Sequence, residues 1–310
     1  MAETNTDTGL VGSVGTALPT RSDLAELSSS RKALLLMAPL LAFEALIFVV
    51  PFFILLRISV TEGSSDHVYE PGTWSLESYA VVFNSGLLHD IILYSFLLGA
   101  IVTVLSVLIG LFYAYAIWRS SGIVKSLLLL SVVMPLLTTL VIRTYAFNPL
   151  LSPTGTFNDV LLSAGLLSEP IQFVPATAGA VAGQLYIVLP YAVLAIYSVL
   201  ATMDWGIVEA ARDLGASRPR SFVEVVLPQV IPGIIVAAVI SFAWSVGAYA
   251  APDLLSNGIT FAVHAEDLMI GDMRYSLAAA LSVVMLVLML VSVTAITLVL
   301  NRFGGDFDLA

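Results

Sequence analysis

The sequence predicts an all-α fold, a polytopic membrane bundle with six transmembrane helices, on the strength of three observations. Hydrophobic residues make up 59% of the chain and charged residues only 11%, whereas about 25% of a typical soluble domain is charged. The apolar residues lie in runs that reach the roughly 20 helical residues needed to cross a bilayer. The runs are apolar on every face, while barrel strands would alternate apolar and polar residues over about ten positions.

The predicted spans follow one another along the chain as six apolar runs. In chain order they occupy residues 33–56, 91–118, 126–142, 171–203, 225–252 and 275–301. Five runs contain no charged residue, and the first contains only Glu44. Glu44 could pair two helices or line a path between them, because an ionisable group in a bilayer is costly and usually faces a partner or a cavity.

These spans form one predicted transmembrane domain, residues 31–303, between two tails. Residues 1–30 are polar and rich in Ser, Thr and Gly, which predicts a disordered cytoplasmic tail rather than a folded domain. Residues 304–310 form a second cytoplasmic tail. Three prolines inside the spans predict kinks that neighbouring helices tolerate: Pro135, Pro190 and Pro232.

The basic residues orient the predicted spans. Of the 12 Lys and Arg residues, all but Arg57, Arg143 and Arg274 fall in the tails or in the second and fourth connections. Because cytoplasmic loops retain Lys and Arg, we expect a multi-pass protein of the cell membrane with both termini in the cytoplasm. The outer connections are then acidic, which would suit cationic solutes or basic partners, or reflect adaptation to a salty medium.

Several kinds of chemistry are excluded by residues that the chain lacks. It has no cysteine, so disulfides and thiolate metal sites are absent, and its three histidines lie without metal-ligand spacing. No GxxxxGK[ST] loop occurs, so the chain does not bind ATP in the P-loop manner. No HExxH, and no GxSxG with suitable Asp and His residues, is present either. We therefore expect no catalysis, no metal and no cofactor in this chain.

Charge gathers instead in the connection between the fourth and fifth spans, residues 204–228. Asp204 is expected to cap a helix that begins at Trp205, and Gly215 to end it in the left-handed conformation. One face of that helix carries four residues at i, i+3, i+4 and i+7: Ile207, Ala210, Ala211 and Leu214.

A second short helix is expected to follow, capped by Ser217 and with Pro219 in its first turn. Its apolar face would consist of Phe222, Val225 and Val226. The two helices form an amphipathic elbow, which could lie in the headgroup layer or present its apolar face to a groove on a soluble partner.

The residues of the elbow carry a resemblance to a known family. The series EAA at 209–211, GA at 215–216, Phe222, LP at 227–228 and PG at 232–233 resembles the EAA loop of permease subunits from binding-protein-dependent ABC importers. The resemblance implies the type I ABC importer permease fold, with the elbow as a coupling helix pair docked on a cytoplasmic ATPase. The docking residues that it implies are Glu209, Ala210, Ala211, Asp213, Leu214, Gly215, Ala216 and Phe222.

Three further segments resemble the spermidine/putrescine branch of these permeases: VIRTYAF at 141–147, LPYAVLAIYSVLATMD at 189–204 and GAYAAPDLL at 247–255. The sequence departs from that branch at Asn148–Pro149 and Ser256–Asn257. Importers of ferric iron, thiamine and phosphonate share much of the pattern, so the solute stays open. A secondary carrier is a further alternative, although no internal repeat of the kind common in carriers is visible.

The resemblance also implies partners in a lipid membrane. They are a dimer of cytoplasmic ATPase subunits that binds ATP and Mg, a second and different permease subunit, and an extracytoplasmic solute-binding protein. We expect no nucleic-acid partner.

Polar and aromatic residues near the outer halves of the fourth and fifth spans are candidates for the solute pathway: Gln184, Tyr186, Trp244, Tyr249 and Asp253. A polyamine needs carboxylates for its ammonium groups and aromatic faces for cation–π contacts. Asp253 and Tyr249 offer both, although Asp253 could equally be an ordinary acid at a helix end.

Overall fold

The structure is a computed structural model that describes residues 29–64, 67–68, 70 and 72–304. Nearly all of the predicted tail at 1–30 and residues 305–310 of the second tail lie outside the described residues. Among the described residues every regular element is a helix, which agrees with the predicted fold class. The chain divides into two units, Met1–Ile54 and Leu55–Ala310.

The described part of the first unit is one apolar helical segment. Helix α2 (Ser29–Glu44) leads into a π-helical turn, η1 (Ala45–Val49), and then into the first residues of α3 (Val50–Ser59). The stretch Leu34–Ser59 is long and apolar enough to cross a membrane, in agreement with the first predicted span. Glu44 is the last residue of α2, directly before the π-helical turn, a feature that often marks functional positions in helices.

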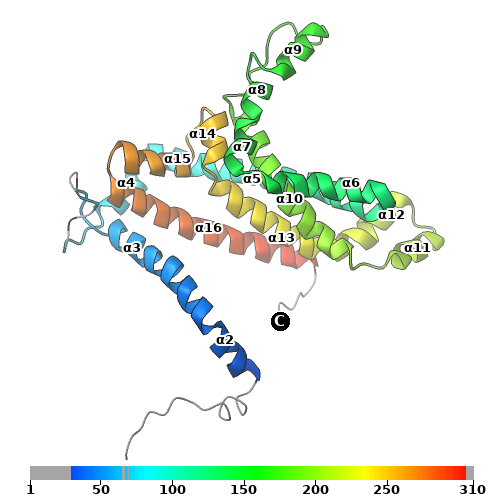
Figure 1. Ribbon diagram of the computed structural model, residues 1–310, viewed down its shortest axis with the longest axis horizontal. Coiled ribbons are helices and arrows are strands. Elements are labelled where there is room, and N and C mark those ends of the chain that lie inside the picture. The colour runs from blue at the N-terminus through cyan, green and yellow to red at the C-terminus, as the bar shows by residue number, and fades with distance from the viewer. Residues whose placement is uncertain (1–28, 65–66, 69, 71, 305–310) are drawn as a thin grey trace, which may run out of the picture. The chain divides into compact units, whose positions relative to one another are not determined.

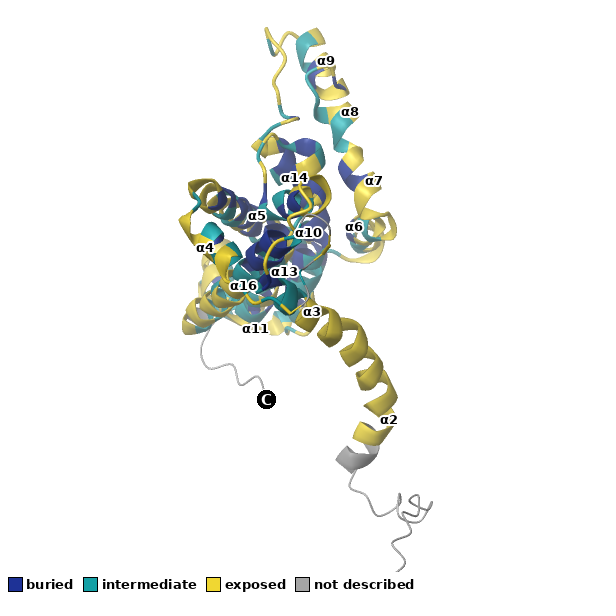
Figure 2. Cartoon of the chain, turned by 90° about the vertical axis from the view of Figure 1, so that its left-hand side faces the viewer, coloured by how far each residue is buried: buried dark blue, intermediate teal, exposed yellow. Residues whose placement is uncertain are grey.

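The second unit is built on four long helices. They are α5 (Gly86–Arg119), α10 (Thr177–Leu200), α13 (Leu227–Val246) and α16 (Tyr275–Gly304). Helix α13 packs against the other three, and α10 also packs against α5 (Figure 1). Buried positions concentrate where these helices meet, as the dark blue ribbon of Figure 2 shows.

Shorter elements connect the long helices. Before α5 lies α4 (Glu77–Asn84). Between α5 and α10 lie α6 (Gly122–Val133), η2 (Met134–Leu137), α7 (Leu140–Tyr145), α8 (Phe147–Leu151) and α9 (Thr156–Ser163). Between α10 and α13 lie α11 (Trp205–Asp213), α12 (Arg218–Ser221) and η3 (Phe222–Val226). Before α16 lie α14 (Ala250–Leu255), α15 (Phe261–Glu266) and η4 (Asp267–Gly271).

Small residues bring the central helices close together. A Cβ atom on Gly233 of α13 would lie 3.0 Å from the Cα of Ile196, and one on Gly110 of α5 would lie 3.3 Å from the Cβ of Ala192. In a membrane, where lipid is as apolar as the side chains, helix association depends on such close packing. Helices α5 and α13 are therefore both held tightly against α10.

The third predicted span is not one continuous helix, and in this respect the prediction for residues 126–142 was wrong. The segments Gly122–Leu137 and Leu140–Ser163 meet at a bend of 109° and count together as the sixth span, beside five helices long enough to cross alone. Buried Arg143 donates from Nε and Nη2 to the carbonyl oxygen of Thr138, at 3.0 and 2.6 Å. The guanidinium thus satisfies a carbonyl that the helix end leaves free, which makes the bend stable inside an apolar run.

The fifth predicted span also stops early. The helix begun at Arg218 ends at Val246, and a break at residues 247–249 separates it from α14. Pro190 and Pro232 lie inside α10 and α13, which continue through them. Apolar composition alone had extended the span to residue 252, because α14 is also apolar and largely buried.

Candidate functional site

The elbow between α10 and α13 begins with the capped helix that the sequence predicts. Asp204 Oδ1 accepts a hydrogen bond from the Gly206 N–H at 2.9 Å, and α11 starts at Trp205. The helix ends at Gly215, whose φ is +93°. The N–H groups of Gly215 and Ala216 then donate to the carbonyls of Arg212 and Ala211 at 2.9 and 3.0 Å, so the last helical carbonyls are satisfied.

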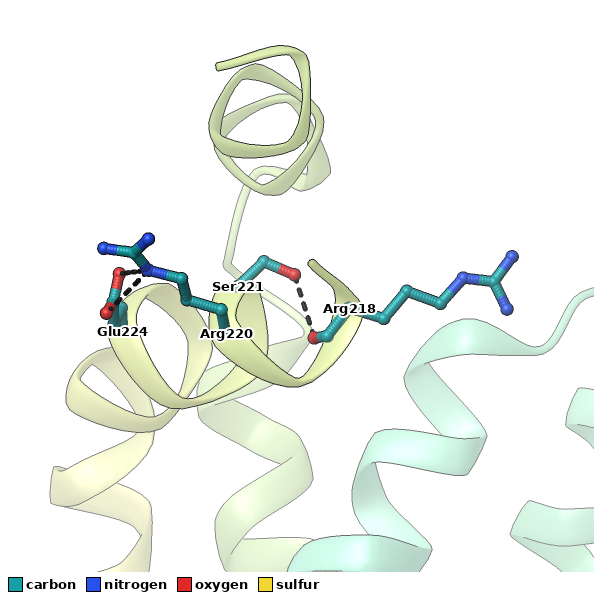
Figure 3. A network of polar contacts seen from close by, with 4 residues as sticks. All are labelled: Arg218, Arg220, Ser221 and Glu224. Carbon is teal, nitrogen blue, oxygen red and sulfur yellow. Dashed lines mark hydrogen bonds and ion pairs between the residues drawn. The ribbon is translucent and has the colours of Figure 1, made fainter. Parts of the chain in front are cut away.

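The second helix of the elbow begins at Arg218 with Pro219 in its first turn, as predicted. Ser217 occupies the cap position, but its side chain makes no capping hydrogen bond, so that part of the prediction was wrong. The two helices are instead joined through Ser221. Its Oγ donates to the Arg218 carbonyl at 3.0 Å (Figure 3), and it accepts from Arg212 Nε at 3.3 Å.

One face of the elbow is anchored in the bundle. Val208 is fully buried in the same cluster as Val226. The ring of Phe222 lies edge-on to Tyr115 at 5.1 Å and parallel to Phe112 at 6.5 Å, both of which belong to α5. Phe222 is therefore half-buried against α5 rather than free on the outer face of the elbow.

The opposite face of α11 is apolar and open. Leu214 is 90% exposed and Ile207 48% exposed, and Ala210 is exposed beside them. Glu209 accepts a hydrogen bond from the Trp205 indole N–H at 2.7 Å, which fixes its side chain along the edge of this face. Of the remaining predicted docking residues, Asp213 and Gly215 are exposed and Ala211 and Ala216 are partly buried.

A cavity of about 440 Å³ lies at the other end of α13. It is lined by α7, by Ile187 of α10 and by the break that follows α13. Two of the five predicted pathway residues, Trp244 and Tyr249, line it, and each is close to 40% exposed. The Trp244 ring stacks on Tyr191 with centroids 5.5 Å apart, so the indole is held in place at the cavity wall.

The other three predicted pathway residues lie outside the cavity lining. Gln184 is 1% exposed, and neither its amide oxygen nor its amide nitrogen has a hydrogen-bond partner in the described structure. Tyr186 packs edge-on against Phe147 with centroids 5.6 Å apart. Asp253 is exposed on α14.

The structure adds Glu266, which sequence reasoning missed, to Tyr249 and Asp253. Burial, followed by the negative charges of Asp253 and Glu266, raises the pKa of Tyr249 above its ordinary value. Glu266 lies at the end of α15, and no motif or spacing in the sequence links it to the other two. Among the described residues no three His, Asp or Glu side chains form a metal site.

Comparison with known proteins places the chain in a family. A family model described as "Binding-protein-dependent transport system inner membrane component" matches residues 106–304, which include the elbow, the cavity and the whole of α10, α13 and α16. The chain is 32% identical over 218 residues to the spermidine/putrescine transport system permease protein PotB of Haemophilus influenzae, covering 69% of this chain and 75% of PotB. It is 29% identical to PotB of Escherichia coli over 199 residues, covering 64% and 70%.

A solved structure has the same fold. The bacterial alginate ABC transporter, crystallised with an alginate-loaded periplasmic protein, contains a chain that matches 90% of this one with a TM-score of 0.70 and 17% identity, over 98% of its own length. A secondary carrier is not favoured by any of these matches. This chain is a multi-pass inner-membrane protein and belongs to the family of binding-protein-dependent transport system inner membrane components.

Proposed function

We propose that this chain is the permease subunit of an ATP-driven importer for polyamines, with both of its termini in the cytoplasm. In this proposal two cytoplasmic ATPase subunits bind ATP and Mg and dock on the elbow. A second, different permease subunit completes the pathway, and an extracytoplasmic binding protein delivers the solute. The similarity to PotB and the retention of basic residues on one side of the predicted spans support the proposal.

The observation that carries the proposal is the continuity between elbow and cavity. Arg218–Val246 forms one helical segment of 29 residues, which is about 43 Å long at 1.5 Å per residue. The open face of α11 is attached at one end of this segment, and Trp244 lines the cavity at the other. Movement of the elbow by the ATPases would therefore tilt α13 as a rigid rod and switch the cavity between inward-open and outward-open states.

The chemistry around the cavity suits a polyamine. Asp253 and Glu266 supply carboxylates for ammonium groups, and the rings of Trp244 and Tyr249 supply faces for cation–π contacts. The largely apolar lining of the cavity, which includes Ile187, suits the methylene chain between the charges. A phosphonate would meet like charge at the two carboxylates, so this alternative is disfavoured on electrostatic grounds.

The test is the ATPase activity of the purified assembly with its binding protein, titrated in turn with spermidine, putrescine, ferric iron and thiamine. We expect stimulation by a polyamine alone. Stimulation by another solute would leave the proposed importer function standing and reject the polyamine as its solute. Failure to assemble with any ATPase would reject the importer function itself.

The orientation can be tested separately because the chain has no cysteine of its own. A Leu214→Cys variant should react with a membrane-impermeant maleimide only in inside-out vesicles, and a Leu166→Cys variant only in intact cells. Both leucines are well exposed, at 90% and 71%. The opposite labelling pattern would reverse the proposed topology.

A further inference from the structure

A second cavity, of about 590 Å³, lies where the end of α5 meets the elbow. It shares no residue with the cavity at Trp244. Its lining combines three aromatic rings with three guanidinium groups: Phe112, Tyr115, Phe222, Arg119, Arg212 and Arg218. Among the described residues no acidic side chain lines it.

The three arginines line the same cavity, and none of them forms an ion pair with a carboxylate of the described residues. Arg119 lies over the ring of Trp205 at 3.9 Å, and Arg212 lies 5.2 Å from the centre of the same ring. Within the described residues the one ion pair is Arg220–Glu224, with Nε and Oε1 2.9 Å apart. Figure 3 shows that Arg218 extends to the opposite side of the short helix from that pair. The cavity therefore brings together three positive charges that make no ion pair with a carboxylate of the described chain.

The cavity also spans two environments. Phe112 is seven residues before Arg119 in α5, a distance of about 10 Å along the helix. Phe112 is 65% exposed in the last quarter of the apolar span Gly86–Arg119, about two helical turns inside its end, and its ring stacks on Phe222. Arg119 is the last residue of the helix, at the level where a span reaches the headgroups. The cavity thus has an apolar end at the depth of acyl chains and a cationic end at the depth of phosphates.

We propose that this cavity binds one anionic phospholipid. The phosphate would lie among Arg119, Arg212 and Arg218, because guanidinium groups pair with phosphate oxygens through two parallel hydrogen bonds. An acyl chain would lie along Phe112 and Phe222. Basic pockets between helices on the cytoplasmic side recognise anionic headgroups in this way, and the assignment of this side to the cytoplasmic leaflet rests on the proposed function. The bound lipid would join the elbow to α5 beside the docking face.

The experiment is native mass spectrometry of the purified full chain, released from detergent with phosphatidylglycerol or with phosphatidylcholine of the same acyl chains. We expect about tenfold greater retention of phosphatidylglycerol. Arg119→Gln and Arg218→Gln should each lower that retention about fivefold, which corresponds to the about 1 kcal/mol that one basic residue contributes near an anionic surface. Arg220→Gln is the matched control, because Arg220 is paired with Glu224 and does not line the cavity; it should retain the lipid as the unmodified chain does.

Each of four results would overturn the proposal. The first is equal retention of phosphatidylglycerol and phosphatidylcholine, and the second is an equal loss of phosphatidylglycerol retention in Arg218→Gln and Arg220→Gln. The third is full displacement of the lipid by the same concentration of glycerol 3-phosphate, and the fourth is its displacement by an ATPase subunit. The third would assign the site to a free phosphate ester and the fourth to an acidic segment of the partner. Retention of phosphatidylcholine by every variant shows that the chain is folded. Lipid retention without polyamine-stimulated ATPase activity would leave this site in place and remove only the proposed function.

Discussion

Two interruptions flank α13, and they are built in opposite ways. The elbow before α13 is made by local signals: Asp204 caps its first helix, and Gly215, with a φ of +93°, ends it. The break after α13 has no such signal, since Gly247 has an ordinary φ of −84°. That break is held by packing, because Leu255 of α14 is fully buried and its carbonyl accepts from the Ala176 N–H at 3.0 Å. A locally encoded turn can leave its apolar face free for a partner, whereas a turn held by packing has its apolar residues already engaged.

The largest effect is expected on the open face of the elbow. Leu214→Asp places a charge directly after α11, on the most exposed apolar side chain of the elbow. Loss of a central docking contact costs about 2 kcal/mol or more, a drop of about 30-fold in ATPase binding. Co-purification with the ATPase and polyamine uptake should both fall while the chain stays in the membrane. Leu166→Asp is the matched control, an exposed leucine remote from the elbow, and should leave both unchanged. Undiminished uptake in Leu214→Asp would mean that α11 does not dock.

The glycines of the two interruptions should differ in their tolerance of a side chain. Gly215→Ala forces an L residue into the left-handed region, at a cost of about 1–2 kcal/mol, although the space around it is open. Gly247→Ala adds a Cβ about 3.4 Å from the Ala243 carbonyl oxygen, an ordinary contact, and should change stability by less than about 0.5 kcal/mol. Thermal unfolding of the two purified variants measures the difference. Equal melting temperatures would contradict the view that the elbow depends on a local glycine signal and the break after α13 does not.

At the break, we expect charge to act on solute affinity rather than on assembly. Asp253→Asn and Glu266→Gln should each raise the KM for spermidine about fivefold, the equivalent of about 1 kcal/mol for one exposed ion pair, and leave ATPase binding intact. Asp159→Asn, an exposed acid on α9, is the control. A change in kcat with no change in KM would assign the two acids to a role other than solute binding.

The smallest effects on stability are expected at the two cap positions of the elbow, of which only one makes a capping hydrogen bond. Asp204→Ala removes the bond to the Gly206 N–H and should lower stability by about 1 kcal/mol. Ser217→Ala removes a side chain that makes no capping bond and should change stability by a few tenths of a kcal/mol. Denaturation of the two variants side by side provides the measurement, and a larger loss in Ser217→Ala would contradict the capping geometry.

The sequence by itself determined the class of the protein and the local architecture of the elbow. Apolar run length predicts spans because a bilayer sets the length of a helix that crosses it. The positions of Asp204 and Gly215 predict a helix end because caps act between residues a few positions apart. The same is true of the EAA spacing that identified the family. The packing of Phe222 against α5 could not be predicted in this way, because helical spacing places the ring on one face of its helix but does not say which other helix covers that face.

Only the tertiary structure decided where the apolar runs break and which distant residues meet. The bend at Thr138 depends on Arg143 folding back, and the break after Val246 depends on α14 packing against α10. Glu266 joins Asp253 and Tyr249 from a separate helix, and Arg119 meets Arg218 across nearly 100 residues of chain. The segments on both sides of each break are largely apolar, so the choice between a straight and a broken span is made by packing and buried hydrogen bonds, which act between residues too far apart in sequence for a short-range pattern to predict.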